Sequence, residues 1–197
     1  MRPSADAYEE RIANLSDVDL NLLMADLLRA HAYRCIGTAA GVRTNAEIKA
    51  GDDGCDGWTP APKTTDPWFG DQATCWQFKA GTAGEPRKLR NEITKAIPRE
   101  TLTSGGRFVV IASGSTSGIR GERARVKALR EEAIAAGIPD ERIEVLGADR
   151  LTRWCNEHPA VAARWAGRSD GLQQFGTWSA MDAHQAPWQS SGAIRTS

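Results

Sequence analysis

The sequence contains no apolar run approaching the roughly 20 residues that a helix needs to cross a bilayer, and its N-terminus lacks the apolar stretch of a signal peptide. It also lacks an excess of either charge, since 25 lysines and arginines balance 25 aspartates and glutamates. These absences favour a cytoplasmic protein without membrane contact. Charge balance neither supports nor excludes nucleic-acid binding, because a basic face can coexist with an acidic one.

Cysteines and histidines are few and far apart. No Cys-x-x-Cys pair exists, and the histidines do not fall at zinc-ligand spacing, so we expect buried free thiols and no structural zinc site. Ser/His/Asp catalysis has no local support either. His31 lies on an apolar helix stripe, which is typical of a hydrogen-bonded core histidine, and His158 precedes a proline where a helix ends. The residues concerned are Cys35, Cys55, Cys75, Cys155, His31, His158 and His184.

No nucleotide-binding loop is complete. The segment from Gly114 to Gly118 follows an apolar run and resembles the turn of short-chain dehydrogenases, but Arg120 stands where the third glycine would be. Both tyrosines of the chain precede this segment, so the downstream Tyr-x-x-x-Lys of that family cannot exist. No Gly-Lys-Ser/Thr of a P-loop follows. We expect a plain connector, with contact to DNA phosphates through backbone N–H groups and Arg120 as the alternative.

Hydrophobic periodicity predicts an α/β domain. Ser16 is a favourable N-cap for an amphipathic helix of about 15 residues, whose apolar positions recur at helical spacing from Leu20 to His31. Further along, strands alternate with helices, which favours a sheet with helices on both sides. The expected elements are a short strand at 45–50, a turn at 51–57, a long loop at 59–72, a strand at 73–80, a helix at 85–96, a buried strand at 107–113, a helix at 120–136, a strand at 142–146 and a helix at 149–157.

Two parts of the chain differ in composition. Residues 1–166 form the predicted domain, whereas residues 167–197 are rich in serine, glycine, glutamine and alanine without a period. The second part has the composition of a linker or tail leading towards a further module.

The stretch from residue 47 to residue 79 carries the candidate chemistry. Alternation along a strand places Gln77 and Lys79 on one face and turns Trp76 and Phe78 the other way, into a core. Asp56 ends the glycine-rich turn and is the preferred ligand for a divalent cation. Gln77 offers an amide oxygen, and Lys79 can stabilise charge developing on a phosphate.

Each part of this pattern has a plain alternative. Gly-Asp-Asp-Gly is a common turn sequence, and glutamine and lysine occur on many solvent-facing strands. Their occurrence in this order, with a helix before and a helix after, is more specific. Asp52 and Glu47 are candidates for a second carboxylate, and an acid on the first helix remains open. Basic clusters around Lys88 and Arg123 are typical of solvated helix faces.

The arrangement of Asp56, Gln77 and Lys79 behind the glycine-rich turn resembles the PD-(D/E)xK nuclease superfamily, and within it the Mrr-like restriction endonuclease branch. The resemblance implies a restriction-endonuclease-like mixed β-sheet core, flanked by helices on both faces. It implies that Asp56 is a metal ligand, Gln77 a ligand or ligand-positioning group, and Lys79 the catalytic lysine. The leading helix of that family often bears a glutamate, and Asn21 stands at this position here.

Downstream patterns resemble effector domains of bacterial antiviral proteins, in which such a nuclease is fused in front of a STAND-type NTPase sensor. The segments that carry this second resemblance are 88–93, 107–113 and 154–162. It implies a fused sensor module and self-association when active.

Together these observations predict a Mg²⁺-dependent endonuclease, with Mn²⁺ as a substitute, that hydrolyses double-stranded DNA by in-line attack of metal-activated water. Low sequence preference follows from the absence of a recognition module. Lys88, Arg120 and Arg123 are the expected nucleic-acid contacts. The alternative is a nuclease-like module that only binds DNA or protein, and an RNA ligand is a third possibility.

Overall fold

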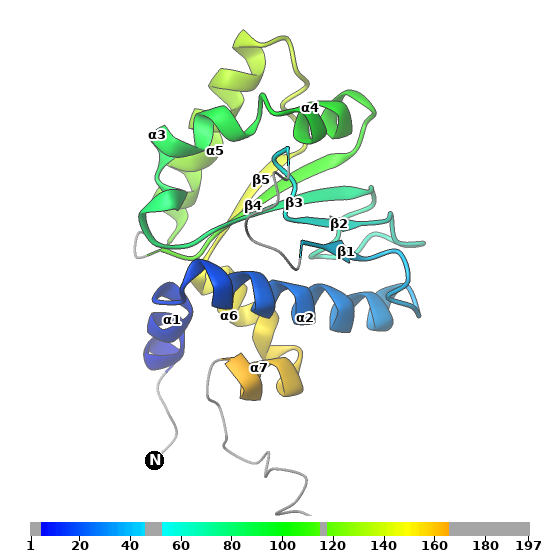
Figure 1. The fold of residues 1–197 in the computed structure, drawn as a ribbon, viewed down its shortest axis with the longest axis vertical. Coiled ribbons are helices and arrows are strands. Elements are labelled where there is room, and N and C mark those ends of the chain that lie inside the picture. The colour runs from blue at the N-terminus through cyan, green and yellow to red at the C-terminus, as the bar shows by residue number, and fades with distance from the viewer. Residues whose placement is uncertain (1–4, 46–52, 115–117, 166–197) are drawn as a thin grey trace, which may run out of the picture.

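The computed structural model describes residues 5–45, 53–114 and 118–165, with the side chains of residues 5–8 excepted. Their centre is a five-stranded sheet in the order β1-β2-β3-β4-β5 (Figure 1). The first three strands are antiparallel neighbours, and β3, β4 and β5 are parallel. The strand bounds are β1 Arg43–Thr44, β2 Gly57–Thr59, β3 Thr74–Lys79, β4 Arg107–Ala112 and β5 Ile143–Gly147.

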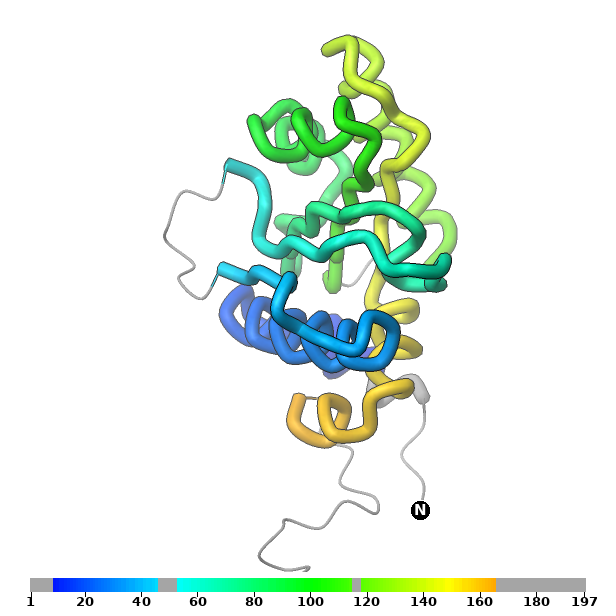
Figure 2. Tube along the Cα trace, turned by 90° about the vertical axis from the view of Figure 1, so that its right-hand side faces the viewer, coloured from blue at the N-terminus to red at the C-terminus, as the bar shows by residue number. Residues whose placement is uncertain are grey.

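Helices cover both faces of this mixed sheet, as the sequence predicted (Figures 1 and 2). One layer contains α1 (Ala5–Ala13), α2 (Asp17–Cys35), α6 (Ala148–Asn156) and α7 (Pro159–Trp165). The opposite layer contains α3 (Pro86–Leu89), α4 (Ala96–Thr103) and α5 (Ile119–Ala135), together with the short 3₁₀ turns η1 (Gly81–Gly84) and η2 (Arg90–Glu92).

The two faces of β3 enter two different hydrophobic cores. Trp76 and Phe78 pack with the buried leucines of α2, as predicted. Cys75 belongs to the core on the other face, which includes Leu129 of α5. Because strand side chains alternate, Gln77 and Lys79 point into the α3–α5 layer. The side chain of Gln77 is almost completely buried there, with the residue 1% exposed.

Helix α2 confirms the clearest of the predictions. Ser16 caps it by accepting a hydrogen bond from the backbone N–H of Asp19 at 3.1 Å. Its apolar stripe is buried from Leu20 to His31, as the periodicity indicated. The helix runs 19 residues, longer than expected, and ends at Cys35.

The expected helix at 85–96 is wrong. The chain instead forms α3, the 3₁₀ turn η2 and a separate helix α4. Lys95 adopts an extended conformation, with φ −63° and ψ 158°, which breaks the helical path. Pro98 explains the restart, because a proline is accepted in the first turn of a helix and not in its interior.

Other elements differ less. The helix expected at 120–136 and the strands at 107–113 and 142–146 are present within one or two residues. Helices α1 and α7 were not predicted. Strand β1 lies just before the strand expected at 45–50, most of which falls outside the described residues. The loop at 59–72 begins with the last residue of β2 and contains a tight turn closed by a bridge between Asp66 and Gly70.

In the part of the chain that the structure describes, no helix has the length and apolarity needed to span a bilayer. The proposed tail at 167–197 lies outside that part.

Arg125 provides a test of the packing between α5 and the turn that follows β3. It is 1% exposed, and its Nε donates to the carbonyl of Gly84 at 2.6 Å. Burial lowers the pKa of its guanidinium. Because a Met side chain keeps most of the volume and loses the donors, Arg125→Met should lower the free energy of unfolding by about 1–3 kcal/mol, measured by urea denaturation.

The control is Arg123→Met on the exposed side of the same helix. Its unfolding free energy should stay within about 0.5 kcal/mol of the wild type. Equal losses in the two variants would contradict a structural role for the buried arginine.

Candidate functional site

Backbone hydrogen bonds fix Asp56 immediately before β2. Its N–H donates to the carbonyl of Trp76 at 2.8 Å, and its carbonyl accepts from the N–H of Asn45 at 3.0 Å. The preceding turn uses left-handed backbone at Asp53 (φ 44°) and Gly54 (φ 90°). The glycine is required here, because a Cβ on Gly54 would lie 2.8 Å from Cβ of Lys95. The predicted turn therefore delivers Asp56 to the strand pair β2–β3.

The carboxylate of Asp56 meets Gln77 and the backbone of β3. Its Oδ2 accepts a hydrogen bond from the N–H of Phe78 at 2.6 Å and a short one from Nε2 of Gln77. Asp56 is 9% exposed. The amide of Gln77 is oriented by this contact, because a carboxylate needs a donor. Two of the three predicted catalytic residues are thus in direct contact.

The amide oxygen of Gln77 has no hydrogen-bond partner among the described residues, although it is buried. A buried polar atom without a partner costs free energy, so such an atom in a folded protein calls for an explanation. A bound cation or an ordered water would satisfy it. An amide oxygen beside a carboxylate is a donor set that fits a hard divalent cation such as Mg²⁺.

Lys79 makes an ion pair with Glu92, a residue that the sequence did not single out. Nζ of Lys79 lies 3.1 Å from Oε1 of Glu92, and Nζ of Lys95 lies 2.7 Å from Oε2 of the same carboxylate. Glu92 is 9% exposed. On the continuous helix expected at 85–96, this glutamate would have been one charged side chain among several. In the structure it lies on the 3₁₀ turn η2, between α3 and α4.

The remaining candidate ligands do not join this group in the described structure. Glu47 and Asp52 lie outside the described residues. On α2, the first helix that the sequence predicted, the side chain of Asn21 donates to the carbonyl of Asp17. Asp19 of α2 accepts from the hydroxyl of Ser16, and Asp26 accepts from Arg164 and Trp165 of α7. The choice of a second carboxylate stays open among Glu47, Asp52 and these acids of α2.

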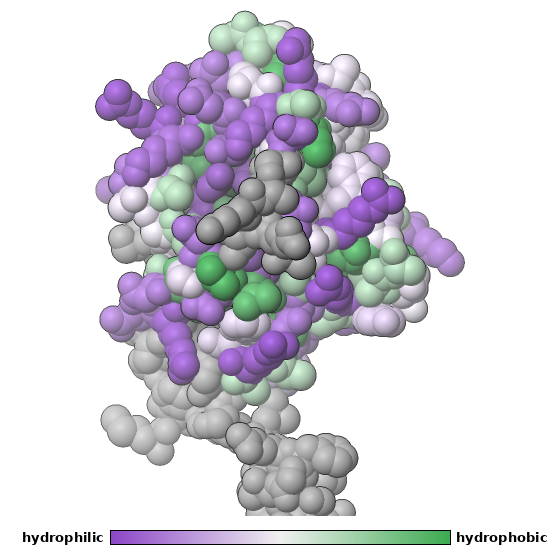
Figure 3. All heavy atoms as spheres, in the orientation of Figure 1, coloured by the Kyte–Doolittle hydropathy of each residue, from purple (hydrophilic) through white to green (hydrophobic). Residues whose placement is uncertain are grey.

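The three expected nucleic-acid contacts lie on the helices next to this face of the sheet. Lys88 lies on α3, and Arg120 and Arg123 lie on α5, which packs against α3. All three are exposed. Lys88 donates to the hydroxyl of Thr82 at 3.0 Å, and Arg123 lines a groove of about 600 Å³ between α5 and β5. Hydrophilic side chains dominate the visible surface of this layer (Figure 3).

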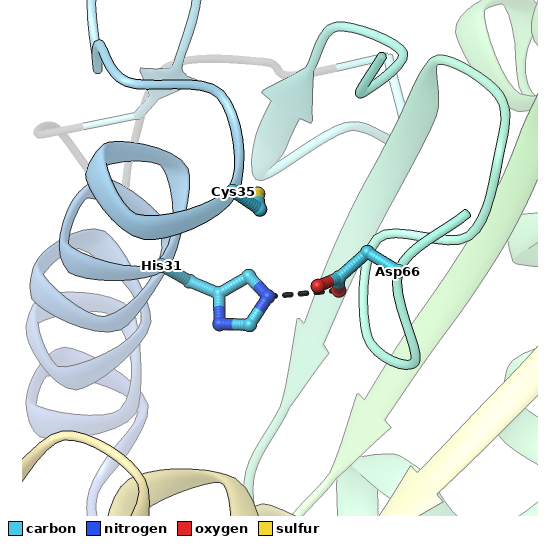
Figure 4. A group of neighbouring side chains, drawn as sticks. All are labelled: His31, Cys35 and Asp66. Atoms are coloured by element: carbon cyan, nitrogen blue, oxygen red, sulfur yellow. Dashed lines mark hydrogen bonds and ion pairs between the residues drawn. The ribbon is translucent and has the colours of Figure 1, made fainter. Parts of the chain in front are cut away.

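A second polar cluster lies in the α2 layer (Figure 4). His31 and Cys35 are one helical turn apart on α2, and Asp66 approaches from the loop between β2 and β3. Their ligand atoms lie within 4.8 Å of one another, so they have the composition of a metal site. The spacing of His31 and Cys35 is a signal that sequence reasoning missed, and Asp66 could not be added without the fold.

Hydrogen bonds favour a structural role for this cluster. The indole N–H of Trp154 donates to Nδ1 of His31 at 3.0 Å. An indole nitrogen is only a donor, so Nδ1 is unprotonated and Nε2 carries the proton. Nε2 therefore donates to Oδ1 of Asp66 at 2.8 Å. A metal on Nε2 would require Nδ1 to be protonated against the indole N–H.

The thiols have no sign of activation. Burial raises the pKa of Cys35, and the charge of Asp66 raises it further. Burial raises the pKa of Cys155 to about 12. A thiol becomes a nucleophile when its pKa is lowered, so neither residue is placed for covalent chemistry. None of the four cysteines forms a disulfide, as predicted, but only Cys75 and Cys155 are buried, whereas Cys35 and Cys55 are partly exposed.

Comparison with protein-family models, with curated proteins and with solved structures found no match for this chain. The functional conclusion therefore depends on the geometry of the chain itself.

The histidine cluster predicts acid sensitivity. Burial lowers the pKa of His31. The pKa of His158 is lowered to about 4, mainly by burial and to a smaller extent by the charges of His31 and Arg34. The folded state thus favours neutral histidines, so their contribution is complete above about pH 6.5 and is lost as the pH falls towards 4. His158 alone accounts for up to roughly 3 kcal/mol of this loss.

Urea unfolding at pH 7, 6, 5 and 4 measures this dependence. Nε2 of His158 lies 3.0 Å from Nδ1 of His31. His158→Gln keeps a side-chain donor at this place but cannot titrate, so the stability of the variant should fall less steeply over this range. An unchanged slope in the variant would contradict the assignment. The titration of Asp66 changes the stability only at still lower pH. Burial raises the pKa of Asp66, but hydrogen bonds from the Phe69 N–H and His31 outweigh this effect and hold the pKa below its usual value.

Proposed function

We propose that this chain is a metal-dependent endonuclease that hydrolyses double-stranded DNA with low sequence preference. The observation that carries the proposal is the contact of the Asp56 carboxylate with Gln77 across β2 and β3, with Lys79 two residues further along the same face. Each of these groups has a role in phosphodiester hydrolysis, and their spacing in sequence was the basis of the prediction.

The topology supports a restriction-endonuclease-like core. The resemblance to PD-(D/E)xK nucleases implies a leading helix, with the aspartate and the Gln-x-Lys on adjacent strands. Here α2 precedes the sheet, Asp56 lies immediately before β2, and Gln77 lies on β3, the antiparallel neighbour of β2. The chain then crosses through α3 and α4 to β4, which runs parallel to β3.

Asp56 and the amide oxygen of Gln77 would hold the cation. A bound Mg²⁺ supplies an activated water at neutral pH and neutralises charge on the phosphate. The N–H of Phe78 and Nε2 of Gln77 orient the Asp56 carboxylate, and Lys79 brings a positive charge to the same face of β3. Burial of Asp56 and Gln77 keeps bulk water away from these contacts.

A role as an antiviral effector, fused to an NTPase sensor and active after self-association, rests on the sequence resemblance alone. The catalytic proposal does not depend on it.

Plasmid cleavage in the presence of Mg²⁺ or Mn²⁺ tests the proposed reaction. The wild type should nick or linearise supercoiled DNA, and EDTA should abolish this activity. Asp56→Asn and Lys79→Met should each reduce the rate at least about 100-fold, because each removes a charge that acts on the reacting phosphate. Asp56→Asn should also lose any rise in melting temperature that Mg²⁺ gives to the wild type, since that rise reports binding to the folded state.

Matched controls come from the nearby loop. Asp71→Asn and Lys63→Met remove the same charges at exposed positions and should leave cleavage unchanged. Undiminished cleavage by both site variants would refute the site. Tight DNA binding without cleavage by any form would instead identify a nuclease-like binding module.

The basic helices make a separate prediction about binding. If Arg123 contacts a phosphate, Arg123→Gln should weaken binding to unrelated duplexes by a similar factor. It should also reduce the slope of log affinity against log salt concentration by about 0.9, since one fewer counterion is released. Fluorescence anisotropy across a salt series measures both effects.

Arg153→Gln, at an exposed position of α6 in the opposite helical layer, is the matched control. An equal loss of slope in the two variants would show that binding is not localised to the α3–α5 layer.

A further inference from the structure

Glu92 is a glutamate whose side chain is largely buried. Its residue is 9% exposed, and it sits on the 3₁₀ turn η2 between two helices. Charged side chains are seldom buried unless they are paired. The two pairing groups are lysines, one on β3 and one at the N-cap of α4, with N···O distances of 3.1 and 2.7 Å.

This geometry constrains Lys79 in particular. A lysine side chain has four rotatable bonds before the ammonium group, and an exposed one samples many rotamers. The side chain of Lys79 is 19% exposed, and the carboxylate of Glu92 at its tip is 12% exposed. An ion pair screened from water to this extent is worth more than a surface pair. It therefore selects one position for the ammonium group.

Lys79 and Lys95 share the carboxylate of Glu92, and this sharing determines the net charge of the group. Lys95 lies closer to Glu92 than Lys79 does, and the three side chains together carry a charge of +1. Lys79 is thus held without being fully neutralised. The backbone N–H of Ile97 donates to the carbonyl of Asp53 at 3.3 Å, so the segment that carries Lys95 is also attached to the turn before Asp56.

We propose that Glu92 is a positioning residue for Lys79, one that holds its ammonium group in place for contact with the scissile phosphate. The assignment rests on the proposed function for its consequence in catalysis, but the ion pair itself is a property of the folded chain. Glu92 does not touch the phosphate in this account and acts only through Lys79.

Steady-state kinetics of Glu92→Gln test the consequence. The amide keeps the shape and removes the charge, so kcat should fall about 10- to 100-fold with little change in KM, because the loss is confined to the charge developing in the transition state.

Glu131→Gln is the matched control. Glu131 also pairs with two basic side chains, Arg90 at 2.9 Å and Lys127 at 3.8 Å, but its side chain is 46% exposed. Its kinetics should equal those of the wild type. Wild-type kinetics in Glu92→Gln, together with loss of cleavage in Lys79→Met, would overturn the positioning role and leave the proposed function standing.

A second readout does not require activity. Urea midpoints are compared for the wild type, Glu92→Gln, Lys79→Met and the double variant. If Glu92 and Lys79 form one pair, the urea midpoint of the double variant should be no lower than that of the less stable single variant. Additive losses would overturn the pairing. Non-additive losses in a protein that cleaves no DNA would support the pairing and reject the proposed function, so the two failures are distinguishable.

Discussion

The carboxylate of Asp56 accepts hydrogen bonds from the side chain of Gln77 and from the backbone N–H of Phe78, and through them it joins the start of β2 to the end of β3. Strand β2 is only three residues long, so its ladder alone gives little stability. Loss of these donors would remove two hydrogen bonds from a buried carboxylate, which costs free energy. The hydrogen bonds that orient the Asp56 carboxylate in the candidate site therefore also help to hold β2 against β3.

Strand β3 separates two different environments. On one side, Trp76 packs against Phe69 and Trp154, and the indole N–H of Trp154 holds His31 in a single tautomer. Among the described residues, that side holds a large apolar cluster, into which the hydrogen bond between His31 and Asp66 is built. On the other side, Gln77 and Lys79 enter a layer in which the polar groups carry charge and one amide oxygen has no partner among the described residues. The apolar side stabilises the strand by packing, and the other side carries the candidate functional residues Gln77 and Lys79.

The sequence predicted the structure correctly where the periodicity of apolar residues alone determines which side chains are buried. The stripe from Leu20 to His31 predicted α2, and the alternation of Trp76 and Gln77 predicted the two faces of β3. It failed where a tertiary contact overrides the local pattern. Glu92 is buried on the 3₁₀ turn η2, where a continuous helix was expected, and Asp66 reaches His31 across 35 residues. Neither contact leaves a periodic signal, so neither residue could be assigned a partner.

The neutral Gln77 makes the charge at this site depend on residues outside the Gln-x-Lys pattern. One carboxylate, an amide and a lysine sum to zero charge, which would hold a divalent cation only weakly. Under the proposed function, additional negative charge would come from Glu47 or Asp52, which lie outside the described residues, or from the DNA phosphate. If it comes from the phosphate, cation and substrate bind together, and Lys79 must be kept from occupying the cation's place. In that proposal, the ion pair to Glu92 on η2 holds the ammonium group of Lys79 and would provide that separation.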